Sequence, residues 1–143
     1  MTVPAILLPV FIQVALTFAL LMWTGSQRLR AVRAGMVHPG EVSLGEKGWP
    51  APAQQAANTF ANQFELPTLF YVLVILALFT RKADLLFVVL SWAFVLTRFA
   101  HAGIYLTTNY VPHRFMAFLA GVLVLMVMWV IFAARILAGP WPA

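Results

Sequence analysis

The sequence predicts an all-α integral membrane protein, a four-helix bundle with four transmembrane spans. Hydrophobic residues make up 63% of its 143 residues and charged residues only 9%, whereas a soluble domain carries about 25% charged residues. The length allows about four apolar helices of ~20 residues joined by loops. We therefore interpret residues 1–143 as a single membrane domain, with spans at about 3–23, 54–79, 85–106 and 115–137.

The composition also excludes several kinds of chemistry. The chain has no cysteine, so disulfides, thiolate metal sites and a cysteine nucleophile are excluded, and any thiol must come from a ligand. No second histidine or carboxylate falls at metal-ligand spacing with His101, so no metal site is expected. The nine lysines and arginines are spread along the chain without the aromatic interleaving of a nucleic-acid-binding face, so no nucleic-acid partner is expected.

The first span, residues 3–23, lacks a basic leader and a cleavage site, so we expect a retained helix. Gln13 lies inside this span and should face another helix. The helix should continue beyond the membrane to a C-cap at Gly35. Residues 24–53 then form a long basic loop.

The loop charges predict the topology. The side with the long loop carries five basic residues and the side with the termini carries three: Arg28, Arg30, Arg33, Lys47 and Arg114 against Arg81, Lys82 and Arg135. This bias places loop 24–53 in the cytoplasm. Attraction of an anionic ligand or a lipid headgroup is the alternative interpretation of the basic cluster.

The second span, residues 54–79, opens with a polar stripe. Asn58, Asn62 and Glu65 fall within about 60° of one another on a helix. A carboxylate inside a membrane is costly and should face a partner or a water-filled cavity. Pro67 predicts a kink beside Glu65. The stripe indicates either a structural ion pair or a ligand or catalytic cleft, and both can hold together.

The third span, residues 85–106, follows a tight connection at residues 80–84, so the two spans form an antiparallel hairpin. Arg98, His101 and Tyr105 share one helix face. Reflection about the turn places Glu65 within ~3 Å of the level of Arg98 and His101. We therefore predict an ion pair between Glu65 and Arg98, beside a cleft. His101 as a hydrogen-bonded core residue and Tyr105 as an interfacial aromatic residue are the alternatives.

The fourth span, residues 115–137, follows the polar segment that ends at Arg114. An arginine at this interface can present its planar fork to an anion. The alternative is a side chain that only extends to the membrane surface.

These motifs together resemble the MAPEG family, the membrane-associated proteins in eicosanoid and glutathione metabolism. Asn62-x-x-Glu65 followed by Pro67 is similar to the signature of the family's second helix. Arg98-x-x-His101-x-x-x-Tyr105 followed by Arg114 is similar to bacterial and microsomal glutathione transferase members. The likeness extends over nearly the whole chain.

The resemblance implies a homotrimer in a bacterial inner membrane that binds glutathione between its subunits. Such enzymes join the glutathione thiolate to lipophilic electrophiles or use it to reduce lipid peroxides. Carried over by position, Arg114 would stabilise the thiolate. The residues that would hold glutathione or line the same cleft are Asn58, Asn62, Glu65, Arg98, His101 and Tyr105.

One position departs from the family pattern, because Asn58 stands where an arginine is usual. This leaves a second hypothesis open, a non-catalytic MAPEG-like protein that binds lipid or a protein partner in intersubunit clefts. A small exporter that uses one intramembrane carboxylate is a third hypothesis.

Overall fold

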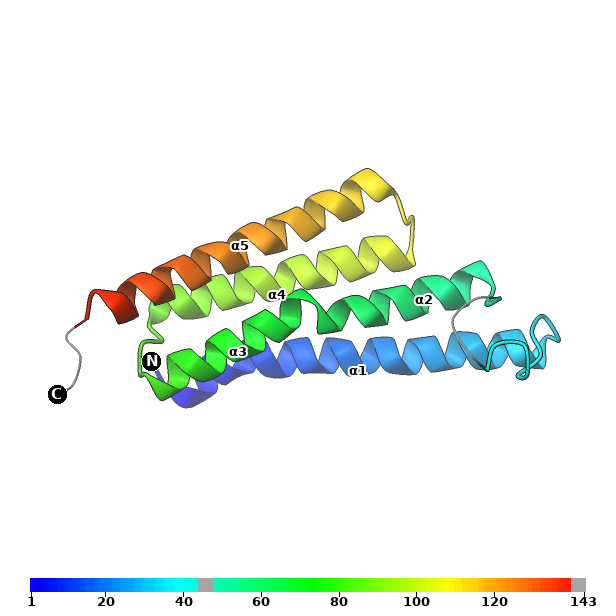
Figure 1. Cartoon of the computed structure of the whole chain (residues 1–143), viewed down its shortest axis with the longest axis horizontal. Helices are drawn as coiled ribbons and strands as arrows, with labels where there is room; N and C mark the ends of the chain where they lie inside the picture. The colour runs from blue at the N-terminus through cyan, green and yellow to red at the C-terminus, as the bar shows by residue number, and fades with distance from the viewer. Residues whose placement is uncertain (44–47, 140–143) are drawn as a thin grey trace.

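The computed structural model describes residues 1–43 and 48–139. The regular elements in this part of the chain are all helices, joined by turns and irregular segments. The helices run along one long axis and form a bundle (Figure 1). Their bounds are α1 Val3–Arg33, α2 Ala51–Ala61, the short 3₁₀ helix η1 Asn62–Phe64, α3 Leu66–Phe79, α4 Leu85–Leu106 and α5 Val111–Leu137. The predicted all-α bundle is confirmed.

Within residues 1–43 and 48–139, four segments are long and apolar enough to cross a membrane, as the composition predicts: Val3–Arg33, Ala51–Phe79, Leu85–Leu106 and Val111–Leu137. The predicted start of the fourth span, at Phe115, was wrong by four residues, since α5 begins at Val111. Pro112 lies in the first turn of α5 and Tyr110 is its N-cap. Proline is favoured in a first turn because its missing N–H would have no partner there.

The long first helix ends in the glycine turn that the sequence predicts. Gly35 has a φ of +69°, and its N–H donates to the Val32 carbonyl at 3.0 Å. The Met36 N–H then donates to the Ala31 carbonyl at 3.1 Å, which completes a Schellman turn. α1 therefore extends beyond any 20-residue span and carries Arg28, Arg30 and Arg33 on its last two turns.

The ends of the bundle fit the predicted connectivity. The start of α1 and the end of α5 lie at one end, and the α1–α2 and α4–α5 connections lie at the other (Figure 1). The side of the membrane that each end faces stays a prediction. Lys47, one of the basic residues on which that prediction depends, lies outside the described residues.

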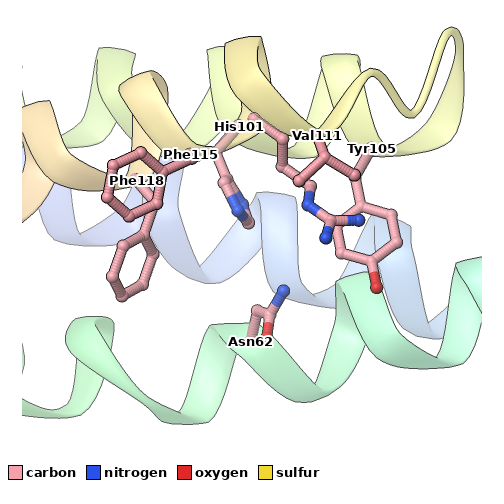
Figure 2. Close-up of a pocket in the computed structure, with 7 residues that line it drawn as sticks. Asn62, His101, Tyr105, Val111, Phe115 and Phe118 are labelled. Carbon is pink, nitrogen blue, oxygen red and sulfur yellow. The ribbon is translucent and has the colours of Figure 1, made fainter.

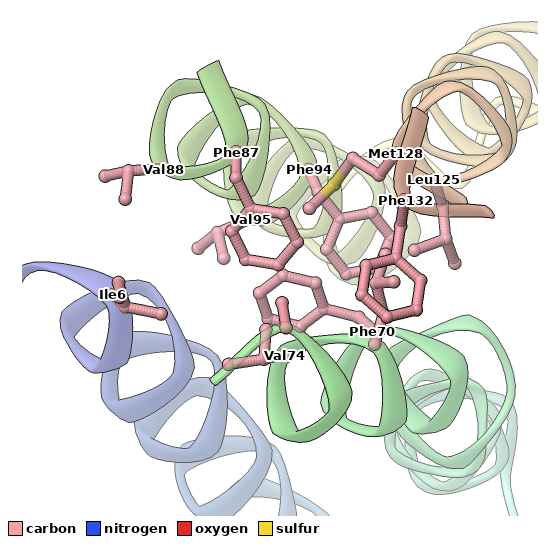
Figure 3. Close-up of a cluster of buried hydrophobic side chains, with 12 residues drawn as sticks. Ile6, Phe70, Val74, Phe87, Val88, Phe94, Val95, Leu125, Met128 and Phe132 are labelled. Carbon is pink, nitrogen blue, oxygen red and sulfur yellow. The ribbon is translucent and has the colours of Figure 1, made fainter. Parts of the chain in front are cut away.

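The apolar core fills the half of the bundle nearer the α3–α4 turn. Phe70 from α3 stacks on Phe94 from α4, with ring centroids 4.8 Å apart. Side chains from all four spans surround this pair (Figure 3): Ile6, Leu73, Val74, Ala77, Phe87, Val88, Val95, Leu125, Met128 and Phe132. Ser91 is buried in this half too, with its hydroxyl hydrogen-bonded to the Phe87 carbonyl at 2.8 Å, whereas Thr59, Gln63, Arg98 and His101 are buried nearer α2.

A tight turn joins α3 to α4 and also fixes α5. Arg81 adopts a φ of 55°, and the Lys82 N–H donates to the Ala77 carbonyl at 2.9 Å. Asp84 caps α4 by accepting the Phe87 N–H at 2.9 Å. Its other oxygen pairs with Arg135 of α5 at 2.7 Å.

Asp84→Ala should lower the free energy of unfolding by about 1 kcal/mol, because the cap is lost. Asp84→Asn keeps a capping oxygen and loses only a solvent-exposed ion pair, so it should cost less than about 0.5 kcal/mol. Denaturation in detergent micelles measures both. Equal losses in the two variants would contradict the capping role.

The same carboxylate should make stability depend on pH. The Arg135 guanidinium and the Phe87 N–H hold the pKa of Asp84 below its ordinary value of 3.8. Because the folded value is depressed, this stabilisation is complete above pH 3.8 and is lost as the pH falls through the folded value. Asp84→Asn should remove this part of the acid dependence.

Candidate functional site

The second span breaks at the polar stripe. α2 ends at Ala61, η1 covers Asn62–Phe64, and Glu65 takes a φ of −89° and a ψ of −102° before α3 begins. Pro67 sits in the first turn of α3, where it needs no N–H partner. The kink that the sequence predicts beside Glu65 is confirmed, and it offsets α2 from α3 (Figure 1).

A buried amide pair holds the break against α1. Gln13 Nε2 donates to Gln63 Oε1 at 2.8 Å, and Gln63 Nε2 donates to the Thr59 carbonyl at 3.1 Å. Both glutamines are almost fully buried. The expectation that Gln13 faces another helix is therefore confirmed, and Gln63, which the sequence did not single out, is its partner.

The polar face of α4 packs against the first turns of α5. The Arg114 guanidinium lies over the Tyr105 ring, 4.2 Å from its centroid. The His101 and Phe118 rings are 5.9 Å apart. Arg98 Nη2 donates to the carbonyls of Ala117 and Phe118 at 3.2 and 3.3 Å. The predicted common face of Arg98, His101 and Tyr105 thus contacts one face of α5.

The predicted ion pair between Glu65 and Arg98 was wrong. No ion pair joins them in the described residues, and Glu65 is exposed on the surface of the bundle. The Glu65 carboxylate acts on Arg98 only through a longer-range electrostatic interaction. Reflection about the hairpin gives the depth of a residue but not the direction of its side chain, and Glu65, directly after η1, is exposed.

A pocket opens where the break in span two faces the α4–α5 connection. Its volume is about 280 Å³. The lining residues are Asn62, His101, Tyr105, Val111, Arg114, Phe115 and Phe118. Asn62 lies opposite His101 and Tyr105 across the pocket (Figure 2). Helix bounds alone would not bring these residues together, because they come from three separate elements, η1, α4 and α5.

Arg114 gives the pocket its charge. Among the described residues it is the one charged side chain in the lining, and no described carboxylate takes part. Nη1 donates to Asn109 Oδ1 at 2.6 Å, while the Tyr105 ring supports the guanidinium from below. Asn109 has a φ of 47°, a conformation that asparagine tolerates better than most residues. The pocket therefore favours an anion.

The other predicted site residues lie outside this lining. Arg98 is buried behind the pocket, and Glu65 is exposed beyond the break. Asn58 Oδ1 accepts a hydrogen bond from Gln54 Nε2 at 2.9 Å, so its amide packs along α2. Four of the predicted residues, Asn62, His101, Tyr105 and Arg114, line the pocket together.

Sequence reasoning missed the apolar side of the pocket, formed by Val111, Phe115 and Phe118. A signal was present, since Val111, Phe115 and Phe118 have the helical spacing i, i+4, i+7. It was hidden because the fourth span was expected to begin only at Phe115, which left Val111 and Arg114 in a loop.

A metal site is not seen in the described residues, where no three histidines, cysteines or carboxylates cluster.

The described residues define a multi-pass membrane protein with a polar site among its helices. This class rests on the four apolar spans, the break in the second span and the cationic pocket at one end of the bundle.

The MAPEG family model matches residues 6–134, so the chain belongs to the MAPEG family. It is thus a membrane protein of the glutathione and eicosanoid metabolism family. No curated protein and no solved structure gave a match.

Gln63→Leu should lower the free energy of unfolding by about 1–2 kcal/mol, because it leaves the Gln13 amide buried without a partner. Replacing both glutamines with leucine should recover most of that loss. Unfolding titrations of the two variants in one detergent provide the comparison. A double variant no more stable than the single one would show that the amide pair does not hold the break.

Proposed function

We propose that this chain is a membrane-bound glutathione-dependent transferase or peroxidase that acts on lipophilic electrophiles or lipid peroxides. The observation that carries the proposal is the Arg114 guanidinium, which contacts Tyr105 and Asn109 in a pocket that no described carboxylate lines. Since the chain has no cysteine, the thiol belongs to the ligand.

Arg114 would favour the reactive form of that thiol. A free thiol has a pKa near 8.5, and an adjacent arginine lowers it, so more thiolate is present at neutral pH. In conjugation the proton leaves to water, and the sulfur forms a bond to the electrophilic carbon as the leaving group departs with its electron pair. In peroxide reduction two thiols become a disulfide, and the hydroperoxide becomes an alcohol and water.

The remaining lining suits both reactants. Asn62 and Tyr105 offer polar groups to a peptide. Val111, Phe115 and Phe118 form an apolar wall for a substrate that enters from the lipid. His101 is mostly buried, with its ring against Tyr105 and Phe118, so we assign it to shaping the pocket.

A homotrimer with glutathione between its subunits agrees with two features of one subunit. The pocket, at about 280 Å³, is at the lower limit for small-molecule sites, which are about 300–1,000 Å³. Glu65 is exposed within an apolar span, where a carboxylate needs a protein partner. A neighbouring subunit over this surface would enlarge the site and cover Glu65.

A second candidate is a non-catalytic protein that binds lipid or a protein partner in the same clefts. Asn58 favours it, since this position adds no cation and its amide oxygen is already used by Gln54. A role in the bacterial inner membrane, with loop 24–53 in the cytoplasm, fits either function.

Arg114→Ala should lower kcat/KM for conjugation of a reactive aryl halide by about 10²–10³-fold, because the thiolate loses its stabilising charge. The kcat/KM of Arg114→Lys should lie between those of Arg114→Ala and wild type, since lysine keeps the charge but not the planar fork. Steady-state rates at varied glutathione give the ratio. Arg33→Ala, at an exposed cation on the end of α1, is the control and should match wild type.

Equal rates for Arg114→Ala and wild type would remove Arg114 from the mechanism. Thermal shift separates the two functions, because a ligand that binds only the folded state raises its melting temperature. Stabilisation by millimolar glutathione without turnover would favour the non-catalytic binder. If millimolar glutathione neither stabilises the protein nor supports turnover, the chain has no glutathione site.

A further inference from the structure

Arg98 is a buried cation that the proposed chemistry does not use. Its residue is 2% exposed, and it is absent from the pocket lining. Within the described residues it has no ion pair. Instead Nη2 donates to the Ala117 and Phe118 carbonyls of α5, and the guanidinium lies between the rings of Phe94 and Phe118, 5.4 and 5.6 Å from their centroids.

Gly121 makes room for this guanidinium. A Cβ at position 121 would collide with Arg98 Nη2 and would lie 2.7 Å from both Arg98 Cζ and Thr97 Oγ1. Thr97 is itself held, since its hydroxyl donates to the Phe94 carbonyl at 2.6 Å. Gly103 on α4 differs, because a Cβ there would have no atom within 4 Å.

The contact lies one to two turns beyond Arg114 on the same helix face. Arg114, Ala117 and Gly121 have the spacing i, i+3, i+7 on α5, and Arg98, His101 and Tyr105 have the same spacing on α4. The two helices are antiparallel neighbours (Figure 1). Arg98 therefore meets Gly121 at one end of this shared face, and Tyr105 meets Arg114 at the other.

We propose that the Arg98–Gly121 contact sets the register between α4 and α5, and that Arg98 is a positioning residue for Arg114. The chemical consequence rests on the proposed function, whereas the register itself does not. A helix is stiff along its axis, so a shift of α5 at Gly121 moves Arg114 relative to Tyr105 and Asn62.

Gly121→Ala should lower kcat/KM for conjugation by roughly tenfold to a hundredfold, because a misplacement of about 1 Å at a reacting group can cost that much. The acid limb of the pH profile of kcat/KM should also move to higher pH, toward the free thiol value of about 8.5. A substitution that only weakens the fold would not move that limb. Gly103→Ala should leave the rate and the profile unchanged.

Arg98→Lys gives a second variant that does not depend on the space at position 121. Lysine keeps the positive charge, but it is shorter and lacks the planar guanidinium that lies over the Phe94 and Phe118 rings, so it should not hold α5 at the same position. It should change the rate and the pH profile in the same direction as Gly121→Ala. A wild-type profile in Arg98→Lys and in Gly121→Ala would overturn the positioning role.

The register can be measured without any turnover. The chain is free of cysteine, so cysteines at the exposed residues Leu96 on α4 and Met116 on α5 accept nitroxide labels selectively. Dilution with unlabelled chain keeps each labelled pair within one subunit. Pulsed electron paramagnetic resonance should give one narrow distance in wild type and in Gly103→Ala, and a shifted or broadened distance in Gly121→Ala and Arg98→Lys.

The two readouts separate failure of this inference from failure of the proposed function. If wild type lacks glutathione activity but the distances change as expected, the proposed function fails and the register role stands. If the distances in Gly121→Ala and Arg98→Lys match those in Gly103→Ala, the Arg98–Gly121 contact does not set the register and the inference is wrong.

Discussion

The structure depends on one constraint: a guanidinium inside a membrane bundle must find its hydrogen-bond partners within the protein, since hydrocarbon provides none. Arg98 meets this constraint with two backbone carbonyls of α5. Carbonyls lie at fixed points on a helix, so satisfying the charge also fixes where α5 lies along α4. Gly121 leaves room for the Arg98 guanidinium, because any larger residue at position 121 would occupy the same space. At the other end of the face that α4 and α5 share, the Arg114 guanidinium lies over the Tyr105 ring.

The bundle divides its interior between two tasks. Toward the α3–α4 turn, the stacked rings of Phe70 and Phe94 lie in an apolar core that keeps the spans together. Toward α2, amides and cations replace that core, and the break at η1 opens the pocket beside Asn62. A continuous helix would pack tightly there, because protein interiors leave few voids. The break thus replaces regular packing with open space in the half of the protein where we propose that a ligand binds.

Much of the fold could be predicted from the sequence, because a bilayer imposes long apolar spans and makes each intramembrane polar residue informative. The hairpin, the break near Pro67 and the common face of Arg98 and Tyr105 all followed from spacing. The partner of Arg98 did not, since backbone carbonyls leave no mark in a sequence and the nearest carboxylate in the pattern, Glu65, was the obvious choice. The start of α5 was misplaced because Pro112 suits both a loop and a first helical turn.

The proposed function requires that the Arg114 guanidinium and the Asn62 amide bind the same ligand. An experimental structure of the protein in lipid with glutathione bound tests this most directly. The arrangement of η1, α4 and α5 predicts the glutathione sulfur beside the Arg114 guanidinium, with the peptide against Asn62. Glutathione bound away from this pocket, or an Arg114 side chain turned out to the lipid headgroups while Asn62 faces another cavity, would contradict it.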